Sequence, residues 1–293
     1  MANMELIKKL RDMTQAGVMD AKKALEENGD DLDKAAQWLR EKGIVKAAKK
    51  ASAIATEGVA KILIEGNKAL IIEINSQTDF VAMSDKFIQL SNEITQAVFK
   101  SDAKTIDEAL KAKTIKDVTV DEACTELTAR IGEKTGVRRF EIINKKADEV
   151  FANYVHSNNK IAVLLIMTAG SSEHVGHDVA MHAAAMNPKF LSQKDVDQNW
   201  LINETKILKE QTIAEGKPAD KAEMIVKGRV KKTLAEVCLL DQSFFKDPSK
   251  TIETYLKDNK STAVKYIRYE VGEGIEKKQV DFASEVAAQM GQN

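Results

Sequence analysis

Apolar positions recur at helical spacing through residues 4–43, and turn-forming residues interrupt them twice. The first interruption, residues 14–17, contains a glycine; the second is Asn28 followed by Gly29, a pair typical of a helix end. Either Asp30 or Asp31 can cap the third segment. Three short helices in so few residues predict a small bundle of the ubiquitin-associated (UBA) type, a fold used mostly for docking.

A basic run, residues 46–51, follows the predicted bundle and contains three lysines. Such a run can bind phosphate, or it can be a solvated linker or helix. Three charges are few for a phosphate-binding segment, so the pattern favours the second interpretation.

From residue 56 the period of the pattern changes. Short apolar runs flank a turn at 65–67, which predicts a β-hairpin. A helix over about 85–99 follows it, with Ser84 as a candidate cap. Further along, helical patterns cover 106–111 and 121–131, and a strand pattern covers 138–144.

The hairpin-then-helix order returns later in the chain. Two strand patterns at 150–155 and 161–167 flank a polar turn, and a helical pattern covers 173–186. Two related halves, each a hairpin with helices on one face, predict an α+β core.

Residues 195–237 show two helical patterns separated by a turn that contains glycine and proline. This hairpin has little core of its own, so we expect it to project and to pack antiparallel. An apolar segment at 263–271 precedes a final helical pattern. We therefore expect four parts: a UBA-like docking bundle (1–52), a core N-subdomain (56–145), a core C-subdomain that includes the hairpin (146–262), and a C-terminal module (263–293). The last module is expected to end in a helix through Phe282, Val286 and Met290.

Composition narrows the class of protein. The 293 residues are 43% hydrophobic and 30% charged, which suits folded cores, and the formal net charge is −1. Balanced charge argues against electrostatic binding of nucleic acid over the whole surface. The distant cysteines, Cys124 and Cys238, indicate a reducing compartment. The start of the chain lacks the pattern of a targeting peptide, and no apolar run is long enough to span a membrane, so we expect a cytoplasmic protein.

Candidate chemistry is sparse. His174, His177 and His182 lie close in sequence, but their spacing does not converge on one point, which favours helix packing over a metal site. Cys124 has helical-spaced apolar neighbours and favours a buried thiol. The glycines at 272 and 274 lack the context of a dinucleotide loop, and no phosphate-binding loop is present. We therefore expect a binding protein rather than an enzyme, with no cofactor and no bound metal.

One segment, residues 73–82 (EINSQTDFVA), leaves a strand and enters a polar turn with Asp79 beside Phe80. In one interpretation Phe80 and Val81 staple the start of the next helix and Asp79 caps it. In the other, Phe80 is an exposed aromatic wedge with a charged neighbour, as in a protein–protein hot spot. The residues alone favour the first interpretation.

Three segments together resemble the bacterial elongation factor Ts family. Residues 10–25 (LRDMTQAGVMDAKKAL) are similar to the N-terminal signature of that family, residues 73–82 to its second signature, and residues 268–276 (RYEVGEGIE) to its C-terminal stretch. The second segment is the most specific of the three. The resemblance covers nearly the whole chain.

This resemblance implies guanine-nucleotide exchange on elongation factor Tu, the GTPase that delivers aminoacyl-tRNA. It implies that Thr78, Asp79, Phe80 and Val81 enter beside the partner's Mg²⁺ site, where Phe80 pushes between partner side chains and GDP release follows. It assigns docking to the N-terminal bundle, through the positions of Arg11, Val18 and Met19, in a heterodimer or a two-to-two complex without direct nucleic-acid or membrane contact.

Two positions depart from the family pattern. Met83 stands where the family usually has a basic residue or asparagine, and Val18 stands where it often has methionine. Both are expected to alter affinity rather than mechanism. The alternative from another class is an RNA-associated or ribosome-associated adaptor without exchange activity, using the lysines near 46–50 and 227–232.

Overall fold

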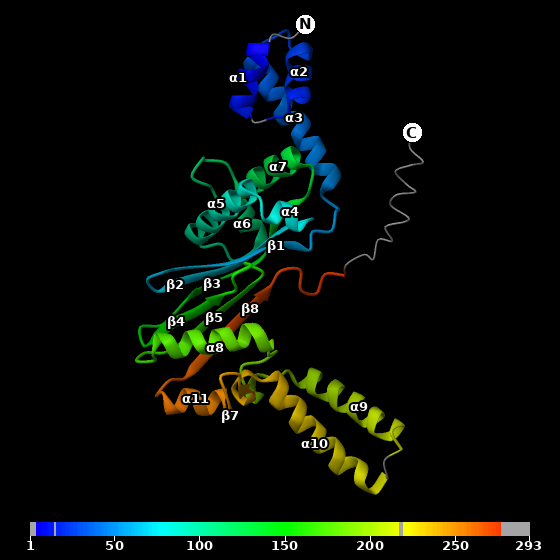
Figure 1. Cartoon of the computed structure of the whole chain (residues 1–293), viewed down its shortest axis with the longest axis vertical. Coiled ribbons are helices and arrows are strands. Elements are labelled where there is room, and N and C mark those ends of the chain that lie inside the picture. Colours follow the sequence, from blue (N-terminus) through cyan, green and yellow to red (C-terminus); the bar gives the residue numbers. More distant parts are fainter. Residues whose placement is uncertain (1–3, 15, 217–218, 277–293) are drawn as a thin grey trace. The chain divides into compact units, whose positions relative to one another are not determined.

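The computed structural model describes residues 4–14, 16–216 and 219–276 (Figure 1). The chain forms two compact units. Unit 1 comprises Met1–Val59, Glu73–Phe140 and Val271–Asn293, and unit 2 comprises Ala60–Ile72 and Glu141–Glu270. Helices and small antiparallel sheets are both present, which confirms the α+β class. Within the described residues no helix is long and apolar enough to cross a membrane.

The first three helices of unit 1 are α1 (Met4–Thr14), α2 (Val18–Glu27) and α3 (Leu32–Lys50). Asp31 caps α3, because its carboxylate accepts hydrogen bonds from two N–H groups of the first turn. The three predicted helices are therefore confirmed. The third is longer than predicted, and the basic run is its last turn rather than a separate linker. Their shared core contains Ile7, Leu10, Ala21, Ala24, Leu25 and Ala35.

The C-terminal half of α3 packs against α7 (Val120–Ile131) within unit 1. Gly43 explains how closely they approach, because a β-carbon there would lie 3.1 Å from Cβ of Ala129. The helix α7 begins with a capping box between Thr119 and Glu122, and it ends at Gly132 in the left-handed conformation.

Strands β1 (Glu57–Glu65), β2 (Lys68–Ser76) and β3 (Thr135–Asn144) form a sheet in the order β1-β2-β3. Helices α5 (Asp85–Ser101) and α6 (Ile106–Lys111) lie between β2 and α7 in the chain. The predicted cap of α5 is confirmed, since the Ser84 hydroxyl accepts the Phe87 N–H at 3.3 Å. The predicted hairpin has a third strand, and that strand begins three residues earlier than its apolar pattern indicated.

In unit 2, strands β4 (Glu149–Val155), β5 (Ile161–Thr168) and β8 (Ala263–Glu270) form an antiparallel sheet with β5 in the centre. Helix α8 (Glu173–Met186) packs on it. Gly176 permits this contact, because a β-carbon there would meet Cβ of Ala152 at 2.4 Å and the sulfur of Met167 at 2.8 Å.

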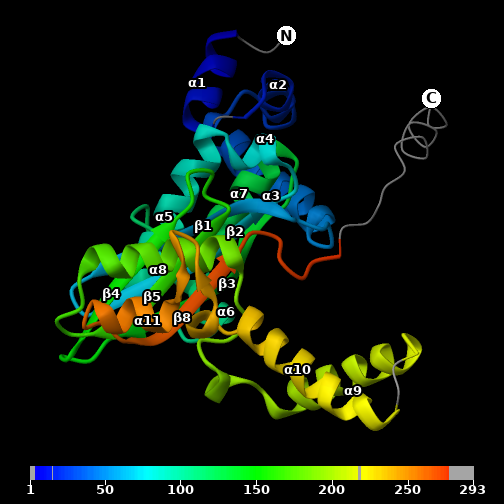
Figure 2. The ribbon, with the colours of Figure 1, turned by 60° about the horizontal axis from the view of Figure 1, so that its bottom comes forward.

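Helices α9 (Gln198–Ala214) and α10 (Ala219–Val237) lie side by side, as Figure 2 shows, and they form the predicted helical hairpin. The sequence did not predict the small sheet of β6 (Ser243–Phe244) and β7 (Asp247–Thr251) or helix α11 (Ile252–Asp258). The predicted last helix, through Phe282, Val286 and Met290, lies outside the described residues. The division into four parts stays a prediction; β8, assigned to the C-terminal module, pairs with β5.

Candidate functional site

Residues 79–81 lie on a one-turn helix, α4 (Asp79–Ala82), between β2 and α5, and Thr78 directly precedes it. The side chain of Phe80 is 80% exposed, Val81 is half-buried and Ala82 is buried. A hydrophobic staple would bury the Phe80 ring, so the interpretation favoured by the residues alone is wrong for Phe80. The aromatic ring is left accessible to a partner.

The predicted cap of this turn is also wrong. Thr78, not Asp79, is the N-cap, and its hydroxyl accepts the Val81 N–H at 3.4 Å. Asp79 already occupies the first helical position, and its carboxylate accepts the N–H of Phe80 at 2.9 Å. A carboxylate in the first turn still stabilises the helix, because the N-terminal end of a helix is partly positive.

Three further hydrogen bonds hold the strand side of this turn. The N–H of Thr78 donates to Oε2 of Glu133 at 3.1 Å, and the Thr78 hydroxyl donates to the same carboxylate at 2.9 Å. The side-chain oxygen of Gln77 accepts the N–H of Lys134 at 2.8 Å. Sequence reasoning missed Glu133, because it lies 55 residues away and shows no local pattern that would connect it to Thr78.

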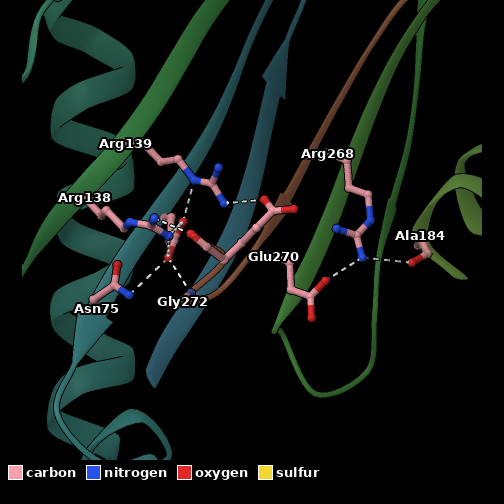
Figure 3. A network of polar contacts seen from close by, with 9 residues as sticks. Asn75, Arg138, Arg139, Ala184, Arg268, Glu270 and Gly272 are labelled. Carbon is pink, nitrogen blue, oxygen red and sulfur yellow. Dashed lines mark hydrogen bonds and ion pairs between the residues drawn. The ribbon is translucent and has the colours of Figure 1, made fainter. Parts of the chain in front are cut away.

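A second polar cluster surrounds Glu73, which is fully buried near the end of β2. Its carboxylate accepts hydrogen bonds from Arg138 at 3.0 and 3.1 Å, from Arg139 at 2.6 Å, from Asn75 at 3.1 Å and from the N–H of Gly272 at 2.8 Å (Figure 3). Burial alone would raise the pKa of Glu73, but these hydrogen bonds outweigh it and hold that pKa below its ordinary value. Glu73 is thus a buried anion that ties β2 to β3 and to the segment after β8.

The structure explains why residue 272, the first of the two glycines noted in the sequence, is a glycine. Its φ is +79°, and a β-carbon there would lie 2.3 Å from the carbonyl oxygen of Thr56. The neighbouring Glu273 also belongs to the cluster, because Arg139 pairs with its carboxylate at 3.1 Å and Arg138 donates to its backbone oxygen. The glycine therefore serves a close backbone crossing within unit 1.

The candidate docking residues lie on the N-terminal helices. Met19, on α2, is 74% exposed and Val18 is 45% exposed. Arg11 is exposed at the end of α1 and donates from Nε to the carbonyl oxygen of Ala16 at 3.3 Å. All three side chains are accessible to a partner, and their docking role stays a prediction.

Among the remaining candidates, His182 and Cys124 are buried, whereas His174 and His177 are exposed. His182 is fully buried; its Nε2 lies 3.0 Å from Oε1 of Gln242, and its Nδ1 accepts the N–H of Phe245 at 3.3 Å. Burial lowers the pKa of His182, so the ring is neutral near pH 7, and the predicted packing role is confirmed for this histidine. Cys124 is buried, and burial raises the pKa of its thiol to about 12. In the part of the chain described, no group of three His, Cys, Asp or Glu side chains is placed to hold a metal ion.

Two comparisons with known proteins cover most of the chain. A family model described as "Elongation factor TS" matches residues 77–273, which include the α4 turn, Glu133 and Gly272. A curated protein named "Elongation factor Ts" from Malacoplasma penetrans (strain HF-2) is 48% identical over 288 residues, covering 97% of this chain and 97% of that protein.

Proposed function

This chain belongs to the elongation factor Ts family, and we propose from that premise that its exposed α4 turn carries out the exchange step. The chain is a translation elongation factor that promotes guanine-nucleotide exchange on elongation factor Tu. It makes and breaks no covalent bond in this role, and its place of action is the cytoplasm, where translation occurs. The family does not favour the alternative of an RNA-associated adaptor.

The observation that carries the proposal is the 80% exposure of Phe80 on a turn anchored at both ends. Exposing a phenyl ring to water is unfavourable in the free protein. Burial of the ring by a partner would stabilise the complex by about 1.5–3 kcal/mol. In this proposal Thr78, Asp79, Phe80 and Val81 enter beside the Mg²⁺ site of elongation factor Tu and disturb the contacts of the metal with GDP. The Mg²⁺ belongs to the partner and its nucleotide.

The thermodynamics require more than the wedge. The factor must bind nucleotide-free partner better than GDP-bound partner, and each ligand then weakens the binding of the other. A thousandfold weakening of GDP corresponds to about 4 kcal/mol of differential binding. Because one phenyl ring supplies less than this, we assign the rest to docking by the UBA-like bundle through Arg11, Val18 and Met19, and by the C-terminal module.

The direct test is the release of labelled GDP from purified elongation factor Tu, with and without this protein, in millimolar Mg²⁺ and in EDTA. Chelation already removes an electrostatic restraint on GDP. We expect a smaller fold-acceleration in EDTA than in Mg²⁺. Equal acceleration in both would contradict displacement of the ion, whereas no acceleration in either would contradict the exchange function.

A mass measurement of the complex separates a heterodimer from a two-to-two assembly.

A further inference from the structure

Helix α4 has little to hold its own geometry. It is four residues long, and only Ala82 is buried among them. A single helical turn is unstable in isolation, because fixing its backbone costs more entropy than one or two hydrogen bonds return. Since the Phe80 ring is exposed and packs against little, its direction depends on how the backbone at both ends of α4 is anchored.

The C-terminal anchor is local. The hydroxyl of Ser84 donates to the carbonyl oxygen of Val81 at 2.7 Å, and Ser84 itself caps α5. This anchor belongs to the next residues of the chain and follows from the local sequence.

The N-terminal anchor comes from a distant residue. Glu133 accepts both the N–H and the hydroxyl hydrogen of Thr78, with its two oxygens 3.1 and 2.9 Å from the hydroxyl oxygen. A hydroxyl carries one hydrogen, so this donation turns the lone pairs of Thr78 toward the Val81 N–H. Hydrogen bonds to an ionised carboxylate are stronger than those between neutral groups.

Glu133 itself stands on a rigid support. It follows Gly132, which ends α7 in the left-handed conformation. Two residues later, the buried Thr135 donates its N–H to the hydroxyl of the buried Thr128 at 3.1 Å, and their hydroxyls lie 3.2 Å apart. The turn from α7 to β3 is therefore fixed from inside, and Glu133 transmits that fixed position to Thr78.

We propose that Glu133 is a positioning residue for nucleotide exchange: it presets the α4 turn so that Phe80 meets the partner already oriented. This inference rests on the proposed exchange role of α4. Preorganisation lowers the free energy of the exchange step after docking, because the free protein already holds the geometry that this step needs. A substitution of Glu133 retains every side chain that is proposed to contact the partner. It removes only the hydrogen bonds that hold the backbone of the α4 turn.

The first measurement uses the free protein and does not depend on the partner. Amide hydrogen exchange at Thr78 and Val81 should quicken by about tenfold or more in Glu133→Ala, whereas amides in the middle of α5 should be unchanged. Glu126→Ala is the matched control, since Glu126 is an exposed acidic residue on α7 that pairs with Arg130. Unchanged exchange at Thr78 in Glu133→Ala would overturn the proposal.

The second measurement follows GDP release from elongation factor Tu over a range of exchange-factor concentrations. The maximal rate of Glu133→Ala should fall by about tenfold at an unchanged midpoint of thermal unfolding, and Glu133→Gln, which keeps one acceptor oxygen, should recover part of that loss. Thr78→Val removes the same hydroxyl contact from the other side, so the losses of the double variant should not add. A normal maximal rate with a loosened Thr78 amide would overturn the positioning role, whereas a wild-type protein without any acceleration would contradict the proposed function instead.

Discussion

The backbone N–H of Gly272 donates a 2.8 Å hydrogen bond to the buried carboxylate of Glu73, 199 residues earlier in the chain. The strand that contains Glu73 continues into the α4 turn, and Gly272 precedes the last described segment, residues 273–276. One buried anion thus fixes the end of the strand that leads to Phe80 and the segment that follows β8, both within unit 1.

Gly272→Ala should destabilise the protein by about 2–4 kcal/mol, because the left-handed backbone strains an alanine and the new methyl group meets the Thr56 carbonyl oxygen at 2.3 Å. Gly274→Ala is the control. Its φ is also positive, +73°, but a β-carbon there meets nothing within 4 Å, so only about 1 kcal/mol of backbone strain is expected. Urea unfolding of both variants checks this difference. Equal losses would show that the close crossing at Thr56 contributes nothing.

The anion at Glu73 predicts a dependence of stability on acid. The pKa of Glu73 is lowered in the folded protein, so the unfolded chain takes up the proton first as the pH falls. The stabilisation is therefore complete above the ordinary glutamate pKa of 4.5 and is lost as the pH falls through the folded value. Thermal unfolding between about pH 3 and 7 should show Glu73→Gln less stable at neutral pH and less sensitive to acid. A parallel pH profile for both proteins would contradict this assignment.

The neutral ring of His182 predicts a second loss of stability on acidification, in a higher pH range than the loss due to Glu73. Burial lowers the pKa of His182 below its ordinary 6.5, so protonation favours the unfolded chain as the pH falls below that value. His182→Gln should flatten the stability profile between about pH 5 and 7, since glutamine does not titrate there. The check is the midpoint of thermal unfolding across that range, and an unchanged slope would assign the titration to another group.

A substitution at Met19 tests docking separately from the exchange step. Its side chain is 74% exposed on α2, so Met19→Asp should leave the fold stable and introduce a charge into the proposed docking surface. We expect the concentration for half-maximal GDP release to rise by about tenfold, with the same maximal rate. A reduced maximal rate at saturation would show that the bundle takes part in the exchange step itself.

Met83 is one helical turn beyond Phe80 and 65% exposed, so the two apolar side chains lie on the same face. Met83→Lys introduces one of the residue types, basic or asparagine, that the sequence comparison above expects at this position. It should raise the half-maximal concentration, because a charge replaces an apolar side chain beside Phe80. Ile115→Lys is the control, since Ile115 is 77% exposed in the loop between α6 and α7. Equal effects of the two lysine substitutions would show that Met83 does not lie in the interface.

Local patterns predicted most of the elements, because apolar spacing and caps such as Ser84 act within a few residues. The missed β6, β7 and α11 are too short for a periodic signal. The site was predicted only in part: a signature identified Thr78 to Val81, but local rules gave the wrong cap and buried Phe80. Glu133 and Gly272 act across 55 and 199 residues, and a single sequence carries no signal at that range.

The maximal rate of GDP release with Phe80→Ala tests the central claim most directly. Because the ring is 80% exposed in the free protein, its removal should leave the midpoint of thermal unfolding unchanged. The account predicts that the maximal rate from elongation factor Tu in millimolar Mg²⁺ falls by about tenfold or more at saturating exchange factor. A variant that unfolds at a markedly lower temperature yet exchanges normally per folded molecule would contradict the account.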